Sequence, residues 1–295
     1  MHPDLAFPVW SSERARRVES VVDRLLPSAS ACPERLHEAM RYAVLGGGKR
    51  IRALLAYAAG ELTGADPAVV DHAAASVELL HAYSLIHDDL PCMDDDVLRR
   101  GKPACHVAFG EATALLAGDA LQSFAFETLA GAGLPDAARA VLHLARAVGS
   151  TGMAGGQAID LACVDQVLDL PELERMHRLK TGALIRAAVR IGADCGRRVD
   201  ADGNDALFRY ASAIGLAFQV VDDVLDVEGT AQSLGKTAGK DAVQRKSTYV
   251  TLLGLTAARE RIEALRAEAR AAVAVFGAPA RRLEELADWI AARTH

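Results

Sequence analysis

The stretch DPAVVDHAAASVELLHAYSLIHDDLPCMDDD, residues 66–96, decides the fold of this chain. Asp66 is a preferred residue for capping a helix N-terminus, and Pro67 suits the first helical position. The residues that follow are strong helix formers and predominantly apolar, until Pro91 stops the helix. The pattern therefore predicts a helix of roughly two dozen residues, from Pro67 to Leu90, that ends in a run of carboxylates.

The same helical pattern continues on both sides of this stretch, interrupted by short Gly, Pro and Asp turns. Abundant Ala and Leu, with only 5% aromatic residues, favour helices over strands, and no segment alternates like a strand. Further helices are expected at 51–62, 137–149, 169–191, 205–226, 259–270 and 281–293. The expected fold class is all-α, a single domain over residues 1–295 with long central helices.

The composition of the chain excludes several classes of partner and cellular location. The net charge of −6 argues against nucleic acid as a partner, although it leaves small phosphorylated ligands possible. No apolar run approaches the ~18 residues of a membrane span, and the N-terminus lacks the layout of a signal peptide. The five cysteines are scattered without a C-x-x-C pair, which fits a reducing compartment. A cytoplasmic protein with no integral membrane segment is expected.

The first acidic cluster lies where a stable helix would not place it. Asp88 and Asp89 occupy a helix C-terminal end, where the dipole disfavours anions, so a bound cation is indicated. Asp94 follows six residues later, and the chain must bend at Pro91 if Asp94 and Asp88 are to reach one metal ion. A single cluster of this kind could also be a solvated acidic cap.

The second acidic cluster gives a tighter argument. Gln219, Asp222, Asp223 and Asp226 fall at i, i+3, i+4 and i+7 on a helix whose other faces are apolar. Such a helix is buried, so its acidic stripe must face a cavity or a metal ion. Paired carboxylates suit Mg²⁺, which completes its shell with water and substrate phosphates. With basic residues following each, the two clusters are expected to form opposing walls of a metal–diphosphate site.

Basic residues are placed to balance this charge. Three glycines, 46–48, lead into a helix N-terminus, which favours anions. Lys49 and Arg52 are three residues apart and can converge on one phosphate, whereas Arg50 then points elsewhere. Arg99 and Arg100 directly follow the first acidic cluster. His81 lies two turns before Asp88 on the same helix face, in line with the site, although a core histidine is as common there.

Several motifs occur together in one order. They are GGKRIR (47–52), HAYSLIHDDLPCMD (81–94), LRRGKP (98–103), GQAID (156–160), KTGAL (180–184), FQ (218–219), DDVLD (222–226) and LGK (234–236). This set resembles the trans-isoprenyl diphosphate synthases, and within them the bacterial farnesyl diphosphate synthases, over roughly residues 40–250. The resemblance implies an all-α bundle around a deep cavity, assembled as a homodimer.

The resemblance also implies roles for individual residues. Asp88 and Asp94 would hold two Mg²⁺ ions and Asp222 a third, with Asp89 and Asp226 as further candidate ligands. The allylic diphosphate would contact Arg99, Lys180, Lys236 and Lys246. Isopentenyl diphosphate would contact Lys49, Arg52, His81 and Arg100. Thr181 and Gln219 would line the developing cation.

Product length is expected to depend on Tyr83, five residues before Asp88, because a bulky ring there can stop chain growth while Ser84 is too small to do so. The resemblance implies head-to-tail condensation of isopentenyl diphosphate with dimethylallyl or geranyl diphosphate, and Tyr83 predicts a C15 product. A geranylgeranyl diphosphate synthase, a class I terpene cyclase and a catalytically silent partner subunit remain alternatives. A cyclase needs no second diphosphate site, and a silent subunit should have lost carboxylates or cations that this chain retains.

Overall fold

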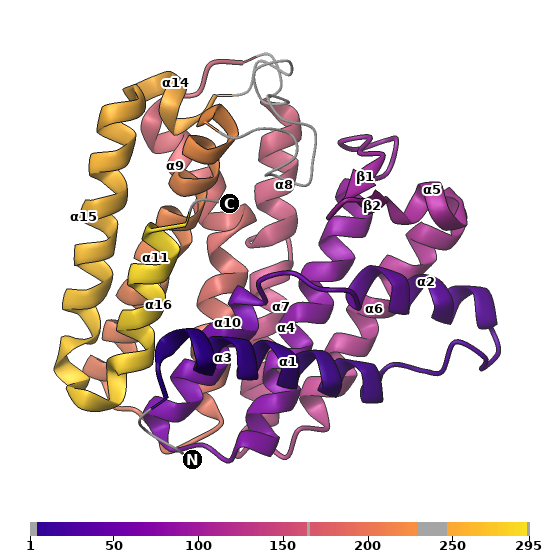
Figure 1. Ribbon diagram of the computed structural model, residues 1–295, viewed down its shortest axis with the longest axis horizontal. Coiled ribbons are helices and arrows are strands. Elements are labelled where there is room, and N and C mark those ends of the chain that lie inside the picture. The colour runs from indigo at the N-terminus through magenta and orange to yellow at the C-terminus, as the bar shows by residue number, and fades with distance from the viewer. Residues whose placement is uncertain (1–4, 164–165, 229–246, 294–295) are drawn as a thin grey trace. The chain divides into compact units, whose positions relative to one another are not determined.

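The computed structural model describes residues 5–163, 166–228 and 247–293, and most of these residues form helices (Figure 1). The predicted all-α class is confirmed. The chain divides into two compact units, Met1–Leu142 with Ile191–Arg197, and His143–Arg190 with Arg198–His295. Each unit is described separately below, and the single domain over residues 1–295 stays a prediction.

The first unit is built around a buried helix, α4. Its elements are α1 (Phe7–Leu25), α2 (Glu34–Val44), α3 (Ile51–Thr63), α4 (Pro67–Asp88), β1 (Leu98–Arg99), β2 (Lys102–Pro103), α5 (Cys105–Phe109) and α6 (Glu111–Ala130). Helix α4 packs against α3 and α6, and also contacts α1 and α2. Contact on several sides explains why its sequence is apolar nearly all round rather than along one stripe.

The ends of α4 follow from local sequence. The Asp66 carboxylate accepts a hydrogen bond from the Ala68 N–H at 2.9 Å, and Pro67 occupies the first turn, as predicted. The helix ends at Asp88, two residues before the predicted end. The chain then turns at Pro91 and enters the hairpin of β1 and β2, which the sequence pattern did not predict. Two residues per strand are too few for an alternating pattern to be visible.

The second unit is organised around α11. Its elements are α8 (Met153–Ala162), α9 (Leu170–Lys180), α11 (Ala201–Glu228), α14 (Tyr249–Leu253), α15 (Leu255–Val273), the 3₁₀ turns η1 (Ala274–Phe276) and η2 (Ala278–Ala280), and α16 (Arg281–Ala291). Helices α7 (Ala137–Val148) and α10 (Gly182–Asp194) contribute residues to both units. Helix α11 packs mainly against α15, and also contacts α9, α14 and α16 (Figure 1).

The predicted helix over 169–191 is in fact two helices. Asp169 and Glu172 form the expected capping box at its start. The helix breaks at Thr181, between α9 and α10, where a β-branched residue and a glycine both weaken helix propensity.

None of the helices in the described ranges has the length and apolar character that a bilayer crossing requires.

Candidate active site

The first acidic cluster folds back on itself after α4. The Asp94 N–H donates to the Asp88 carbonyl at 2.9 Å, and the Asp96 N–H donates to the Asp89 carbonyl at 3.2 Å. Two residues six apart in sequence are thereby brought together by the backbone. The bend at Pro91 that a shared metal ion requires is therefore present.

Within this cluster, Asp89 has a partner of its own. Its side chain is buried, and Arg99 Nε lies 3.0 Å from Oδ1, with a second nitrogen of Arg99 also bonded to it. Arg99 reaches Asp96 as well, at 3.2 Å. Burial raises the pKa of Asp89, and the hydrogen bonds from Arg99 oppose that rise. The pair fixes the guanidinium beside the acidic cluster, and the ligand role of Asp89 stays a prediction.

The glycine turn before α3 is surrounded by cations from the hairpin. Gly46, Gly47 and Gly48 have φ of 109°, 101° and 108°, a conformation that L-residues with side chains avoid. The Arg100 guanidinium donates to the Gly47 carbonyl at 2.9 Å, and a Cβ on Gly46 would lie 2.9 Å from Lys102 Nζ. Because these three glycines have no side chains, Arg100 and Lys102 can lie against the segment that leads to Lys49.

His81 lies among these cations. Its pKa is lowered well below the usual value, first by burial and then by Arg52, Arg100 and other nearby guanidinium groups. The imidazole is therefore neutral near pH 7 and can donate one hydrogen bond without adding charge. The structure brings together His81, Arg52 and Arg100, three of the four residues expected to bind isopentenyl diphosphate, and Lys49 directly follows the turn.

Arg50 is bonded to carboxylates of its own. Burial lowers the pKa of both His81 and Arg100, and the charge of Arg50 lowers both further. Its Nε donates to Glu19 at 2.9 Å, another nitrogen reaches Glu78 at 3.3 Å, and a third bond goes to the Val44 carbonyl at 2.6 Å. Glu78 also accepts the Ala53 N–H at 3.1 Å. This buried network fastens the start of α3 to α1 and α4, so Arg50 has a structural role.

The second acidic cluster divides into two different environments. Asp223 is buried and accepts the Tyr249 N–H at 2.7 Å, which satisfies a free donor in the first turn of α14. Asp222 accepts a hydrogen bond at 2.7 Å from Arg293, whose guanidinium carbon lies 4.1 Å from the centre of the Phe218 ring. Nothing in the sequence pattern pointed to Arg293.

Lys180 and Thr181 stand at the break between α9 and α10. Lys180 Nζ lies 2.6 Å from an Asp160 carboxylate oxygen, and the Thr181 hydroxyl donates to the Gln219 side-chain oxygen at 2.8 Å. Thr181 and Gln219, which were expected to line one site, are therefore neighbours. Asp160 was not predicted as a site residue, although it belongs to the GQAID motif. That motif was the one feature of the sequence that could have indicated its contact with Lys180.

Two glycines allow neighbouring helices to pack closely against this break. A Cβ on Gly156 of α8 would lie 2.1 Å from the Lys180 backbone nitrogen. A Cβ on Gly215 of α11 would lie 2.9 Å from the Gly182 Cα. Because the obstructing atoms belong to backbone, any side chain at these positions would force the helices apart.

Tyr83 is enclosed by α4 and α6. Its ring is only 8% exposed and meets the His87 ring edge-on at 5.5 Å. Burial raises its pKa, while a hydrogen bond with Gln122 of α6 acts in the opposite direction. The Ser84 hydroxyl is bonded to the His81 carbonyl at 2.9 Å, so it turns back onto its own helix. The limit on product length stays a prediction.

The donor set fits Mg²⁺. Asp88, Asp94 and Asp222, the predicted ligands, have hard carboxylate oxygens, which this ion prefers. Within the described ranges no three His, Cys, Asp or Glu side chains converge into a ready-made metal centre. The predicted substrate contacts Lys236 and Lys246 lie outside the described residues.

Comparison with known proteins gives consistent matches along the chain. Residues 33–275 match the model of the polyprenyl synthetase family. The chain is 51% identical over 268 residues to farnesyl diphosphate synthase from Escherichia coli, covering 87% of this chain and 88% of the relative. It is 46% identical over 297 residues to geranylgeranyl pyrophosphate synthase 9 from Arabidopsis thaliana, covering 97% and 81%.

A solved structure agrees with these matches. The geranyltransferase from Helicobacter pylori complexed with magnesium and isoprenyl diphosphate superposes with a TM-score of 0.84 at 32% identity, and the match covers 97% of each chain. The family model spans most of the sequence, and the matched range includes both acidic clusters. The chain belongs to the polyprenyl synthetase family.

Proposed function

We propose that this chain is a Mg²⁺-dependent prenyltransferase that condenses isopentenyl diphosphate with dimethylallyl or geranyl diphosphate to give farnesyl diphosphate and release diphosphate. The observation that carries the proposal is the cation cluster at the glycine turn, where Arg100 donates to the Gly47 carbonyl and Lys102 lies against Gly46, next to Lys49. A cluster of this kind suits a second diphosphate, which an elongating enzyme needs and a cyclase does not. The identity with the E. coli farnesyl diphosphate synthase supports the same activity.

The first step of the proposed reaction requires that the negative charge of the leaving diphosphate be stabilised. Mg²⁺ would neutralise the negative charge that develops on the leaving group and so favour ionisation of the allylic carbon. Asp88 and Asp94 would hold two such ions and Asp222 a third, with Asp89 and Asp226 as further candidate ligands. Asp222 would have to exchange its bond with Arg293 for the metal. The cations that bind the allylic diphosphate would be Arg99, Lys180, Lys236 and Lys246.

Isopentenyl diphosphate, the second substrate, must be bound in an orientation that allows its double bond to react. Lys49, Arg52 and Arg100 would bind isopentenyl diphosphate, with a hydrogen bond from His81, so that its double bond can attack the allylic cation. The Thr181 and Gln219 oxygens carry partial negative charge suited to stabilising that cation. The last proton would leave to the released diphosphate, so no side-chain base is required.

The family suggests further properties. A homodimer in the cytoplasm, with two or three Mg²⁺ ions per site, is proposed on this basis. A geranylgeranyl diphosphate synthase is the second candidate, because a relative with that activity is 46% identical. A silent partner subunit is disfavoured, since the acidic clusters and the basic residues of the family motifs are all retained in the sequence.

A direct assay tests the proposal. The purified protein is incubated with Mg²⁺, isopentenyl diphosphate and each allylic starter in turn, and the dephosphorylated products are sized by gas chromatography. The proposal expects a C15 alcohol as the main product. A dominant C20 product would favour the second candidate, and absence of any condensation would contradict both.

Replacing Tyr83 by alanine should lengthen the product. The ring fills space between α4 and α6, about 7–8 Å of helical rise below Asp88, and its removal opens room for another isoprene unit. We expect C20 or longer products with condensation retained, measured in the same assay. Tyr83→Phe serves as the control and should keep the C15 product, because it retains the ring. An unchanged product from Tyr83→Ala would place the limit on chain growth elsewhere.

The two diphosphates should depend on different cations. Lys49→Ala and Arg52→Ala are expected to raise the KM for isopentenyl diphosphate by about tenfold or more, because each removes a charge-assisted hydrogen bond. Lys180→Ala should instead impair use of the allylic substrate. Steady-state kinetics with one substrate varied at a time separates these effects. If the pattern came out exchanged, the assignment of the two sites would be wrong.

A further inference from the structure

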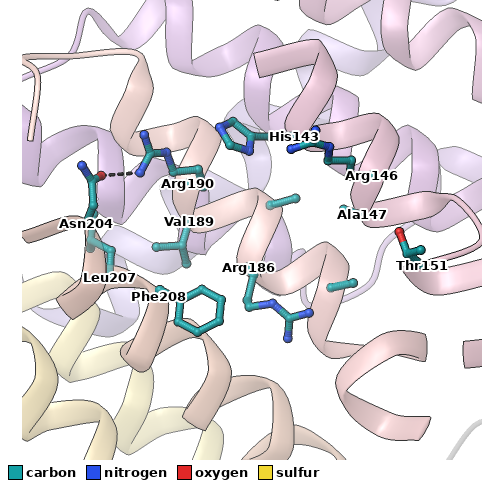
Figure 2. A pocket seen from close by; sticks show the side chains of 12 residues that line it. His143, Arg146, Ala147, Thr151, Arg186, Val189, Arg190, Asn204, Leu207 and Phe208 are labelled. Atoms are coloured by element: carbon teal, nitrogen blue, oxygen red, sulfur yellow. Dashed lines mark hydrogen bonds between the residues drawn. The ribbon is translucent and has the colours of Figure 1, made fainter. Parts of the chain in front are cut away.

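A separate cavity of about 330 Å³ lies in the second unit, between α7, α10 and α11 (Figure 2). Its volume is at the lower end of the range for small-molecule sites. The residues that line it include none of those assigned to metal or substrate above. The proposed reaction therefore does not explain why this cavity has the lining that it has.

The lining of this cavity is strongly basic. Arg146, Arg186 and Arg190 contribute three guanidinium groups and His143 an imidazole, whereas none of the twelve described lining residues is acidic. The described lining residues thus present several hydrogen-bond donors of one charge sign to the cavity. Burial and the nearby Arg178 both lower the pKa of Arg186. An anion in the cavity would relieve this unfavourable environment.

Two of these cations are held in place. Arg190 donates a hydrogen bond to the Asn204 side-chain oxygen, drawn as a dashed line in Figure 2. The Arg186 guanidinium lies 5.8 Å from the centre of the Phe208 ring, and a Cβ on Gly182 would come within 3.0 Å of its Nη1. Donors that are already oriented lose less entropy when a ligand binds.

The cavity also has an apolar side. Leu207 and Val189 line it, and Phe208 stands beside Arg186 with 59% of its surface exposed. A site that combines an aromatic face with several guanidinium groups is complementary to a ligand that has an anionic head and an apolar body. Guanidinium groups match phosphate oxygens through paired hydrogen bonds, and three positive charges suit a dianion better than a carboxylate.

We propose that this cavity binds a phosphomonoester that carries a small aromatic or branched apolar group. The phosphate would lie among Arg146, Arg186 and Arg190, and the apolar group would pack against Phe208 and Leu207. The site is distinct from the positions that bind the diphosphates in the proposed reaction, so the proposal does not depend on that reaction.

Phenyl phosphate is a suitable probe. Its binding to the intact protein is followed by ligand-observed ¹H and ³¹P NMR, in EDTA so that no metal assists binding elsewhere. We expect a dissociation constant on the order of 1 mM or tighter. Inorganic phosphate should bind at least fivefold more weakly, because it lacks the apolar group, and phenol should not bind detectably.

Matched variants locate the site. Arg186→Ala and Arg190→Ala should each weaken binding of phenyl phosphate by about tenfold or more. Phe208→Ala should remove the advantage of phenyl phosphate over inorganic phosphate. Arg209→Ala is the control, because Arg209 lies beside Phe208 on α11 but pairs with Asp205 outside the cavity. Lys180→Ala should also bind the probe as the unmodified protein does.

Three results would overturn the proposal. One is the absence of binding in the unmodified protein, and another is equal weakening by Arg209→Ala and Arg186→Ala. The third is loss of binding in Lys180→Ala, which would place the probe at the allylic site instead. Thermal unfolding of each variant shows whether the fold is intact. If Arg186→Ala is unstable, Arg186→Gln gives the same test with less change in volume.

Discussion

Alanine at Asp88 or at Asp222 is expected to lower kcat by about a thousandfold or more in saturating Mg²⁺. Each substitution removes a carboxylate proposed to hold a metal ion that stabilises the departing diphosphate. Such stabilisation is worth several kcal/mol, and each 1.36 kcal/mol corresponds to a factor of ten in rate. Single-turnover kinetics with geranyl and isopentenyl diphosphates would measure the effect on chemistry without product release.

Matched substitutions make this test specific. Asp95→Asn neutralises an exposed acid of the same cluster to which no role is assigned, and asparagine tolerates the φ of 50° at this position. Asp205→Ala removes an exposed acid from α11. Both should keep more than about half of the activity, because exposed ion pairs contribute little. Circular dichroism should be unchanged in all four variants. Rates near that of the unmodified protein for Asp88→Ala or Asp222→Ala would contradict the proposed metal ligands.

The second large effect is on stability, at Arg50. Arg50→Met should lower the free energy of unfolding by about 3–5 kcal/mol, because it leaves the buried carboxylate of Glu78 without its positive partner. At roughly 2–4 °C per kcal/mol for a chain of this size, the melting temperature should fall by about 10 °C. Differential scanning calorimetry would measure the shift.

A second variant shows whether the loss of stability comes from an unpaired buried charge or from lost packing. Arg50→Met combined with Glu78→Gln should recover part of the lost stability, because the buried charge is removed together with its partner. Arg24→Met, an exposed position on α1, should leave the melting temperature almost unchanged. If the double variant were less stable than Arg50→Met alone, lost packing rather than an unpaired charge would be the cause.

The features that sequence predicts well here are those with local causes. Asp66 with Pro67, and Asp169 with Glu172, mark the starts of α4 and α9 because each cap is made by neighbouring residues. The bend after α4 follows from Pro91 in the same way. The family resemblance implied that His81, Arg52 and Arg100 serve one substrate, and both guanidinium groups lie near enough to His81 to lower its pKa.

What sequence could not predict depends on contacts between distant residues. Arg293 reaches Asp222 across 71 positions, and Asp223 caps α14, a helix 26 residues further along. The acidic stripe on α11 looked uniform, yet its members serve different partners. The break at Thr181 likewise depends on α8 and α11 packing against it, which periodicity within one helix cannot reveal.

The close approach at Gly156 and Gly215 constrains how this protein can evolve. Most core positions tolerate exchange because neighbouring side chains can repack. At these two glycines the neighbours are main-chain atoms, so no substitution elsewhere can make room without moving a whole helix. Selection there acts on geometry alone, whatever the polarity of the incoming residue. Positions of α8 and α11 whose side chains bind no partner should therefore tolerate substitution far better than either glycine.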